Sequence, residues 1–454
     1  MDRIQQKERK GHLVLVPCPL PSHMSPMLHL GKLLHSQGFF ITIIHTQLNP
    51  PNYSQYPEFS FESIGGDVLL ESYSAFDGDV MLFLSELNMK CEIPFHDFLV
   101  NMQSRRRYDN PISCVIYDAV MYFCAGVADH LKFLRIVLRT SSAANYIGLS
   151  ILHENYCLPI QEHQLEEPVA EFPLLRVKDM PLFSTCKHTR EILTCIHNGT
   201  KTASAIIWNS IWCLEHALFE RIEDEILVPI YPIGPLQKHC GSFSTNVLSE
   251  EQNFLVWLDK QAPSSVVYVS IGSVVTMTED ELLEMAWGLA NSDQPFLWVV
   301  RACLVDGSDA VEQLPEEFHE TTRNRGKIAS WLPQQKVLAH KSIGCFLTHN
   351  GWNSTIESIA EGVPMLCWPR VGDQRVNARF VSHVWRVGIQ LEDRLSRDGV
   401  ESAVRTLFSS VDIQERVKEL KKKVEISMRQ EGPSSDFFGR LVKNIRLKEK
   451  TIRL

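Results

Sequence analysis

Residues 331–374 read WLPQQKVLAHKSIGCFLTHNGWNSTIESIAEGVPMLCWPRVGDQ, and the structural prediction starts from this stretch. An apolar run ends at His349, Asn350-Gly351 is a turn signal, and a helical pattern runs from Asn353 to a stop at Gly362. The pattern therefore predicts a strand, a turn and a helix in immediate succession. Such a unit points helix N–H groups and the positive end of the helix dipole at one spot, which suits a diphosphate.

Other side chains of the stretch suit the remaining parts of a sugar nucleotide. Trp331 follows a predicted strand and could stack on a flat base. Glu357 lies one helical turn after Asn353, on the same face, where a carboxylate could accept from ribose hydroxyls. Asp373 and Gln374 open a further helix and could hold sugar hydroxyls. Each residue alone is more often structural, and only the combination at this spacing indicates a nucleotide-sugar site.

The rest of the chain alternates short apolar runs with helical patterns, as in an α/β fold. Near-continuous apolar runs are typical of parallel strands that are buried on both faces. Two doubly wound sheets facing a cleft are predicted, with ligands at the carboxyl ends of the strands. The predicted strands are 12–17, 39–45, 113–118, 134–140, 205–209, 265–271, 296–301, 327–330, 344–348 and 364–367.

Composition excludes several classes of protein. The 454 residues carry a net charge of −9 and are 44% hydrophobic, so we expect globular domains and no nucleic-acid binding. No apolar run is long enough for a membrane span, and residues 1–11 have no apolar core of a secretory signal. The 12 cysteines show no zinc spacing, as expected of free thiols in a reducing compartment. The expected protein is cytoplasmic and monomeric.

The stretch 331–374 closely resembles the signature box of plant UDP-dependent glycosyltransferases that act on small molecules. The resemblance extends to 268–273, 295–301 and 17–30, and thus to effectively the whole chain. It implies the GT-B fold, with two Rossmann-like domains. Composition places the domain boundary after Leu236, because residues 237–252 are polar and look like a linker. The expected organisation is an acceptor-binding domain over 1–236, a linker over 237–252, a UDP-sugar-binding domain over 253–432, and a C-terminal helix over 433–454 that packs back on the first domain.

Carried over position by position, the resemblance assigns the donor site. It implies that Trp331 stacks on uracil and that Gln334 and Glu357 hold the ribose. In this family a final Gln, here Gln374, tends to accompany glucose, whereas His there tends to accompany galactose. The full implied donor set is Ser273, Trp331, Leu332, Gln334, His349, Trp352, Asn353, Ser354, Glu357, Asp373 and Gln374.

Sugar transfer to a hydroxyl also needs a base, because an alcohol is a poor nucleophile until its proton is removed. His23 follows the first predicted strand and Asp118 ends another, so both belong at the rim of a sheet. Both match the His–Asp dyad of the family. His23 is the expected base and Asp118 its orienter, in a single displacement that converts an α-linked donor into a β-glycoside.

Two positions depart from the family pattern. Ser22 stands where Gly usually precedes the base, and Gly there would allow an unusual backbone angle. Arg370 stands where a small or apolar residue is commoner, and one hypothesis is that it favours an acidic acceptor. The acceptor itself is not specified beyond a small apolar or aromatic molecule with a hydroxyl or carboxyl group. The candidate acceptor residues are Phe83, Phe123, Thr140, Ser141, Tyr146, His197 and Arg370.

The sequence thus predicts a hexosyltransferase that moves glucose from UDP-glucose to a plant specialised metabolite or hormone. The alternative is a catalytically impaired UDP-sugar-binding protein, given Ser22. An oxidoreductase lacks its GxGxxG and a serine hydrolase its GxSxG. Asp77-Gly78-Asp79 resembles a metal-binding DxD, but it lies in a polar turn far from the donor box. No cofactor and no metal are expected.

Overall fold

The structure is a computed structural model, and it describes residues 11–64, 79–104, 111–155, 162–181, 187–239, 249–273, 275–301, 304–305 and 313–452. These residues form two compact units. The first comprises the described residues of 1–141, 183–243 and 427–454, and the second those of 142–182 and 244–426. Residues 240–248 of the predicted linker lie outside the described part.

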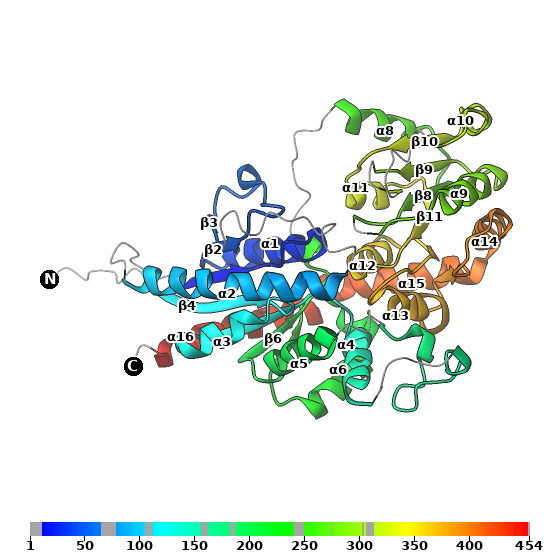
Figure 1. Cartoon of the computed structure of the whole chain (residues 1–454). Coiled ribbons are helices and arrows are strands. Elements are labelled where there is room, and N and C mark those ends of the chain that lie inside the picture. The colour runs from blue at the N-terminus through cyan, green and yellow to red at the C-terminus, as the bar shows by residue number, and fades with distance from the viewer. Residues whose placement is uncertain are drawn as a thin grey trace. The chain divides into compact units, whose positions relative to one another are not determined.

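The first unit is built on a seven-stranded sheet with the order β3-β2-β1-β4-β5-β6-β7, and every paired strand is parallel (Figure 1). The order reverses between β1 and β4, which makes the carboxyl ends of these two strands a switch point. The strands are β1 His12–Val16, β2 Phe40–His45, β3 Ser60–Ser63, β4 Ile112–Asp118, β5 Arg135–Arg139, β6 Ala205–Trp208 and β7 Ile230–Pro232.

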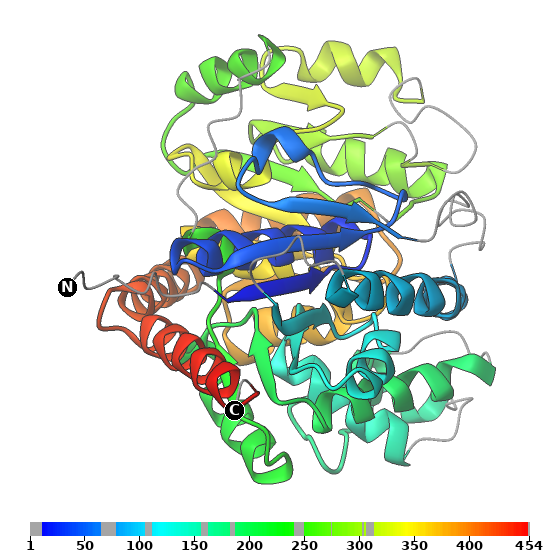
Figure 2. The same cartoon turned by 90° about the vertical axis from the view of Figure 1, so that its left-hand side faces the viewer.

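Helices cover both faces of this sheet. Helix α16 lies on the opposite side of the sheet from α2 (Figure 2). The apolar face of α16 joins α1 and the inward residues of the sheet in one core, and Ser434 donates to the carbonyl of Gly234 at 3.1 Å. The helices of this unit are α1 Pro21–Ser36, α2 Val80–Ser104, α3 Phe123–His130, α5 Lys187–Lys201, α6 Trp212–Glu225, α7 Leu236–His239 and α16 Pro433–Ile452.

The second unit repeats the architecture with a six-stranded parallel sheet in the order β10-β9-β8-β11-β12-β13. Its switch point lies between β8 and β11. The strands are β8 Val266–Ser270, β9 Phe296–Val299, β10 Gly326–Ala329, β11 Ile343–Thr348, β12 Met365–Cys367 and β13 Gly388–Gln390. The helices are α4 Ala143–Asn155, α8 Ser249–Asp259, α9 Glu279–Asn291, α10 Glu316–Thr322, α11 Gln334–Leu338, α12 Trp352–Glu361, α13 Gln374–Arg379, α14 Arg397–Ser409 and α15 Val411–Met428.

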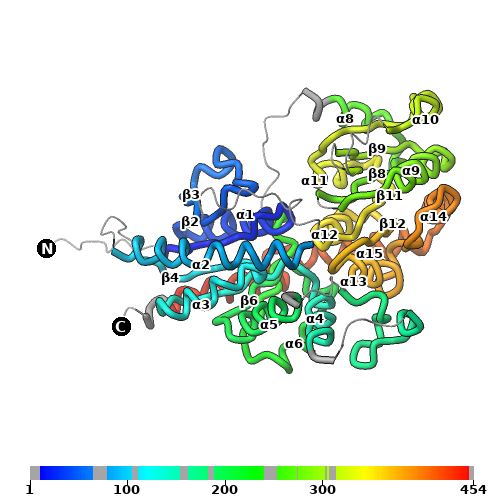
Figure 3. The backbone as a smooth tube through the Cα atoms, viewed as in Figure 1, coloured from blue at the N-terminus to red at the C-terminus, as the bar shows by residue number. Residues whose placement is uncertain are grey.

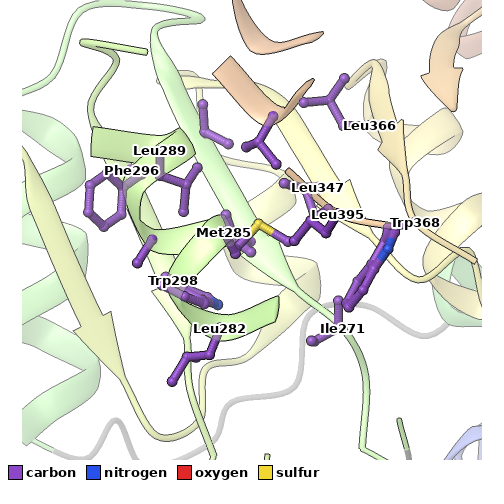
Figure 4. Close-up of a cluster of buried hydrophobic side chains, with 14 of the residues drawn as sticks. Ile271, Leu282, Met285, Leu289, Phe296, Trp298, Leu347, Leu366, Trp368 and Leu395 are labelled. Carbon is purple, nitrogen blue, oxygen red and sulfur yellow. The ribbon is translucent and has the colours of Figure 1, made fainter. Parts of the chain in front are cut away.

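The core of the second unit joins its sheet to α9 and α14 (Figure 4). Leu282 and Met285 of α9 contribute to it, together with Leu347 of β11 and Trp368, which follows β12. All four side chains are completely buried. This core holds the carboxyl ends of β8, β11 and β12 in place, and several of the candidate donor residues follow these ends.

One segment belongs to a different unit from the one that the sequence analysis assigned. Residues 142–182, placed with 1–236, cluster with the second unit, and α4 lies beside α13 (Figure 3). Ser142 donates to Asn377 of α13 at 3.0 Å, and Arg379 forms an ion pair with Asp179 at 3.5 Å. The chain therefore crosses to the second unit after Ser141, which a boundary drawn from composition could not reveal.

All ten predicted strands exist in the structure, and within the described residues three further strands escaped the sequence analysis. These are β3, β7 and β13, which are three or four residues long and stand at sheet edges. A run of three or four residues is a weak signal, so strands of this length were recognised in some cases, such as β10 and β12, and missed in these three.

Candidate functional site

His23 and Asp118 meet at the switch point of the first unit. The Nδ1 atom of His23 lies 2.8 Å from Oδ2 of Asp118, although the two residues are 95 positions apart. His23 belongs to the first turn of α1 and Asp118 is the last residue of β4. The side chain of Asp118 is 1% exposed and that of His23 is 22% exposed. A carboxylate can only accept, so Nδ1 carries the proton and Nε2 is left as the basic atom.

The orientation of this dyad is held from several sides. Oδ1 of Asp118 accepts from the N–H of Val120 at 3.1 Å, which leaves Oδ2 for the histidine. The hydroxyl of Thr140, a predicted acceptor residue just beyond β5, lies 3.0 Å from Nδ1 of His23. Ser22 stands inside α1, whose right-handed backbone does not require glycine. The departure at Ser22 therefore leaves the geometry of the dyad intact.

Asn88 was missed by the sequence analysis. It is 2% exposed, donates to the carbonyl of Val120 at 2.9 Å and accepts from the N–H of Phe123 at 3.1 Å. Asn88 thus ties α2 to the turn that follows Asp118. The signal that could have found it is a polar residue between Leu87 and Cys91, on the buried face of an apolar helix.

The donor candidates stand at the switch point of the second unit, around His349. This residue follows β11, and its imidazole lies close to two glycines. A Cβ atom at Gly272 would lie 2.6 Å from Cε1 of His349, and a Cβ at Gly351 would lie 2.6 Å from Nε2. Gly272 also has a φ of +77°. Both glycines are therefore required for the imidazole to fit.

His349 is a neutral group in this position. Burial, together with the positive charge of Arg301, lowers the pKa of His349 to about 4. Its Nδ1 atom is buried and has no hydrogen-bond partner within the described part of the chain. Arg301 donates through Nε to the carbonyl of Gly272 at 2.9 Å and through Nη2 to the carbonyl of Val275. Arg301 thereby braces the loop that carries the exposed Ser273. A neutral imidazole can offer a hydrogen bond to a phosphate oxygen, but no charge.

The ribose candidates already form a network. Nε2 of Gln334 donates to Oε2 of Glu357 at 2.7 Å and to Oγ of Ser354 at 3.0 Å. The other carboxylate oxygen of Glu357 accepts from Gln335 at 3.0 Å. Gln335 was not predicted. The glutamate is therefore held by two amides that come from α11.

The aromatic candidates differ in accessibility. Trp331 is 65% exposed, as a base-stacking platform must be, whereas Leu332 is 7% exposed. The indole of Trp352 is 3% exposed and packs against Trp385 with 6.4 Å between ring centroids. Trp352 can therefore contribute its backbone N–H at the start of α12, together with Asn353, but not an open ring face.

The sugar candidates Asp373 and Gln374 begin α13, and Asn377 supports them. Nδ2 of Asn377 donates to Oδ2 of Asp373 and to the carbonyl of Asn350, each at 3.0 Å. Its Oδ1 accepts from Ser142 at 3.0 Å. Asn377 is 1% exposed and was not predicted. It connects the turn before α12 with the start of α13.

The predicted acceptor residues divide between the units. Phe83 and Phe123 are buried in the first unit, Ser141 accepts there from the indole of Trp208 at 2.6 Å, and His197 is half-buried on α5. Tyr146 and Arg370 belong to the second unit, where Tyr146 is 2% exposed.

The guanidinium of Arg370 forms a bidentate ion pair with Glu281, with its shortest N···O distance 2.8 Å. The positive charge of Arg370 is therefore paired with a carboxylate of the protein itself. This gives no support to the hypothesis that Arg370 favours an acidic acceptor.

The candidate metal motif is only partly visible. Asp77 and Gly78 lie outside the described residues, and Oδ1 of Asp79 accepts from the N–H groups of Met81 and Leu82 at the start of α2. Asp79 is thus a helix cap. Among the described residues, no group of three or more His, Cys, Asp or Glu side chains could hold a metal ion. Within the same ranges, no helix combines the length and apolar character needed to cross a bilayer.

Comparison with known proteins places these features in a family context. Residues 230–423 match the family described as UDP-glucoronosyl and UDP-glucosyl transferase. The chain is 41% identical to UDP-glycosyltransferase 76B1 of Arabidopsis thaliana over 440 residues, which cover 95% of this chain and 97% of that protein. It is 42% identical to UDP-glycosyltransferase 76E1 of Solanum lycopersicum over 433 residues, with 93% and 89% covered.

Solved structures of plant glycosyltransferases have the same fold as this chain. Os79 of O. sativa, in complex with trichothecene, matches with a TM-score of 0.81 and 27% identity, covering 95% of this chain and 100% of that one. A UDP-glucosyltransferase from Polygonum tinctorium capable of glucosylating indoxyl, in complex with 3,4-dichloroaniline, matches with a TM-score of 0.82 and 25% identity, covering 96% and 99%.

Proposed function

Because this chain belongs to the family of plant UDP-glycosyltransferases, we propose that it transfers glucose from UDP-glucose to a small acceptor, with inversion at the anomeric carbon. The second unit binds the donor and the first binds the acceptor. The observation that carries the proposal is the 2.8 Å contact between His23 and a buried, doubly held Asp118. This arrangement presents a basic nitrogen at the carboxyl end of a sheet, where an acceptor hydroxyl would lose its proton.

The proposed reaction is a single displacement. His23 Nε2 takes the proton of the acceptor hydroxyl, and Asp118 stabilises the imidazolium that forms. The acceptor oxygen forms a bond to the anomeric carbon while the bond from that carbon to the β-phosphate oxygen breaks. UDP departs with the electron pair, towards the N–H groups at the start of α12. An α-linked donor therefore yields a β-glucoside.

Glucose is proposed as the sugar because Gln374 ends the donor box, as is usual for glucose in the family the chain resembles. A small apolar or aromatic acceptor is supported by the trichothecene and 3,4-dichloroaniline bound in the two solved relatives. The acceptor group is a hydroxyl or a carboxyl. The second candidate function is UDP-sugar binding without turnover, which Ser22 first suggested and which the intact dyad disfavours.

Purified protein incubated with UDP-glucose and a panel of hydroxylated and carboxylated aromatic and terpenoid acceptors is expected to yield a product heavier by one hexose. The product should appear in mass spectrometry only when the donor is present. Saturable UDP-glucose binding with no product from any acceptor would instead support the non-catalytic candidate.

Activity is expected to survive removal of divalent cations. The N-terminus of α12 carries the equivalent of about half a positive charge and backbone N–H donors, which together stabilise part of the diphosphate charge without a bound ion. Initial rates in excess EDTA should therefore match those without chelator. Complete loss that Mg²⁺ or Mn²⁺ restores would show that the diphosphate charge is handled by a metal.

A further inference from the structure

Arg370 is engaged on two sides within the second unit. Its Nη1 lies 2.8 Å from Oε1 of Glu281, and its Nη2 lies 3.4 Å from Oε2. Its Cζ atom stands 4.6 Å from the centroid of the Trp368 ring. Trp368 is completely buried and belongs to the core of this unit (Figure 4). The guanidinium is therefore held by a carboxylate and by an immobile aromatic ring.

Glu281 is itself fixed, since it is the third residue of α9 and part of a capping box. Its Oε2 accepts from the N–H of Thr278 at 2.9 Å, and its own N–H donates to the hydroxyl of Thr278 at 3.2 Å. The next residue, Leu282, is completely buried in the same core as Trp368. The ion pair thus fastens the loop after β12 to a helix that cannot easily shift.

The loop held in this way determines the orientation of the Gln374 amide. Oε1 of Gln374 accepts from the backbone N–H of Arg370 at 2.8 Å and from that of Val371 at 3.1 Å. Both partners are donors, so the oxygen must face them. The amide nitrogen then points the other way, with two hydrogens for a sugar hydroxyl. The direction in which Gln374 can donate therefore follows from the placement of two backbone N–H groups.

We propose that Arg370 is a positioning residue for the donor sugar, because its ion pair with Glu281 and its stacking on Trp368 hold the loop that orients the Gln374 amide. The proposal rests on the transfer from UDP-glucose proposed above. Loosening this loop lets the amide rotate, which weakens a hydrogen bond that distinguishes one hexose from its epimers. Arg370 then influences the choice of sugar without touching it.

The test is steady-state kinetics of Arg370→Met with UDP-glucose and UDP-galactose at saturating acceptor. Methionine keeps the apolar length of the side chain and removes the charge and the donors. We expect KM for UDP-glucose to rise about five- to ten-fold with kcat changed less, and the preference for glucose over galactose in kcat/KM to fall by a similar factor. Glu281→Gln preserves the capping box while removing the charge, so it should shift both quantities in the same direction.

Two further variants separate positioning from general stability. The double variant Arg370→Met, Glu281→Gln should resemble Arg370→Met alone, since both single changes break the same pair. Arg370→Lys keeps the charge but loses the bidentate geometry, so it should restore part of the glucose preference. The matched controls are Arg397→Met and Glu284→Gln, which break an Arg–Glu pair between the start of α14 and α9, the helix that also carries Glu281. Both controls should retain the parental preference.

An Arg370→Met enzyme with the parental glucose preference would overturn the proposal, even if its melting temperature were lower. Equal changes in Arg370→Met and in the Arg397→Met control would also overturn it. Failure of the proposed function gives a different result, because the parent enzyme would then form no product from either sugar nucleotide.

Discussion

Replacement of His23 with alanine is expected to lower kcat/KM for a hydroxyl acceptor by about 10²–10⁴-fold. The variant loses the Nε2 base, while the donor residues, all in the second unit, keep their contacts. A carboxylate acceptor is already deprotonated, so ester formation by the same variant should change little. The measurement is the ratio of initial rates for a phenol and for a carboxylic acid, each compared with the parent protein.

A matched control is His35→Ala, because His35 is exposed at the far end of the same helix α1. This variant should keep the parental rates on both acceptors. Undiminished transfer to hydroxyls by His23→Ala would rule out His23 as the base. Equal losses on both acceptor types would indicate that His23 acts in binding or folding and not in proton removal.

Replacement of Glu357 with alanine is expected to raise KM for UDP-glucose by about 10–100-fold, with a much smaller effect on kcat. Hydrogen bonds to a charged group contribute about 1.5–3 kcal/mol, and the ribose lies away from the bonds that change. A loss of this kind is uniform binding, so it appears in KM. The dissociation constant of UDP, measured by calorimetry, should rise by the same factor.

Glu361→Gln provides the comparison, since Glu361 stands one helical turn further along α12 and forms an ion pair with Lys421 at 3.9 Å. The binding of UDP by this variant should be unchanged. If Glu357→Ala bound UDP as tightly as the parent while remaining folded, the ribose assignment would be wrong and the contacts to Gln334 and Gln335 would be purely structural.

Much of the fold could be predicted because its signals are local. A run such as Phe346–Thr348 followed by Asn350-Gly351 and a helix that stops at Gly362 carries its own strand, turn and helix preferences. Ten of the strands were predicted for this reason. The short edge strand β13 was not, because three residues with a glycine and a glutamine among them give only a weak pattern.

The candidate site likewise contains residues that local sequence patterns could predict and residues that they could not. The positions of His349 and Glu357 relative to α12 are local and followed from the spacing. The buried supports Asn88 and Asn377 were invisible, because an asparagine has the same local preferences whether it caps a loop at the surface or bridges two elements inside. Arg370 was noticed as unusual, but its partner 89 positions upstream was not.

By itself, the sequence determined the two-sheet α/β class, the strand-turn-helix after residue 343 and the residue types of a candidate UDP-sugar site, since these depend on neighbours within a few positions. Only the tertiary structure decided that Thr140 joins the expected partner Asp118 at His23, and that residues 142–182 belong to the second unit. It also decided that Glu281 holds Arg370. The physical reason is that such contacts join positions from 89 to 235 apart in the chain, and they form only when packed sheets bring those positions together.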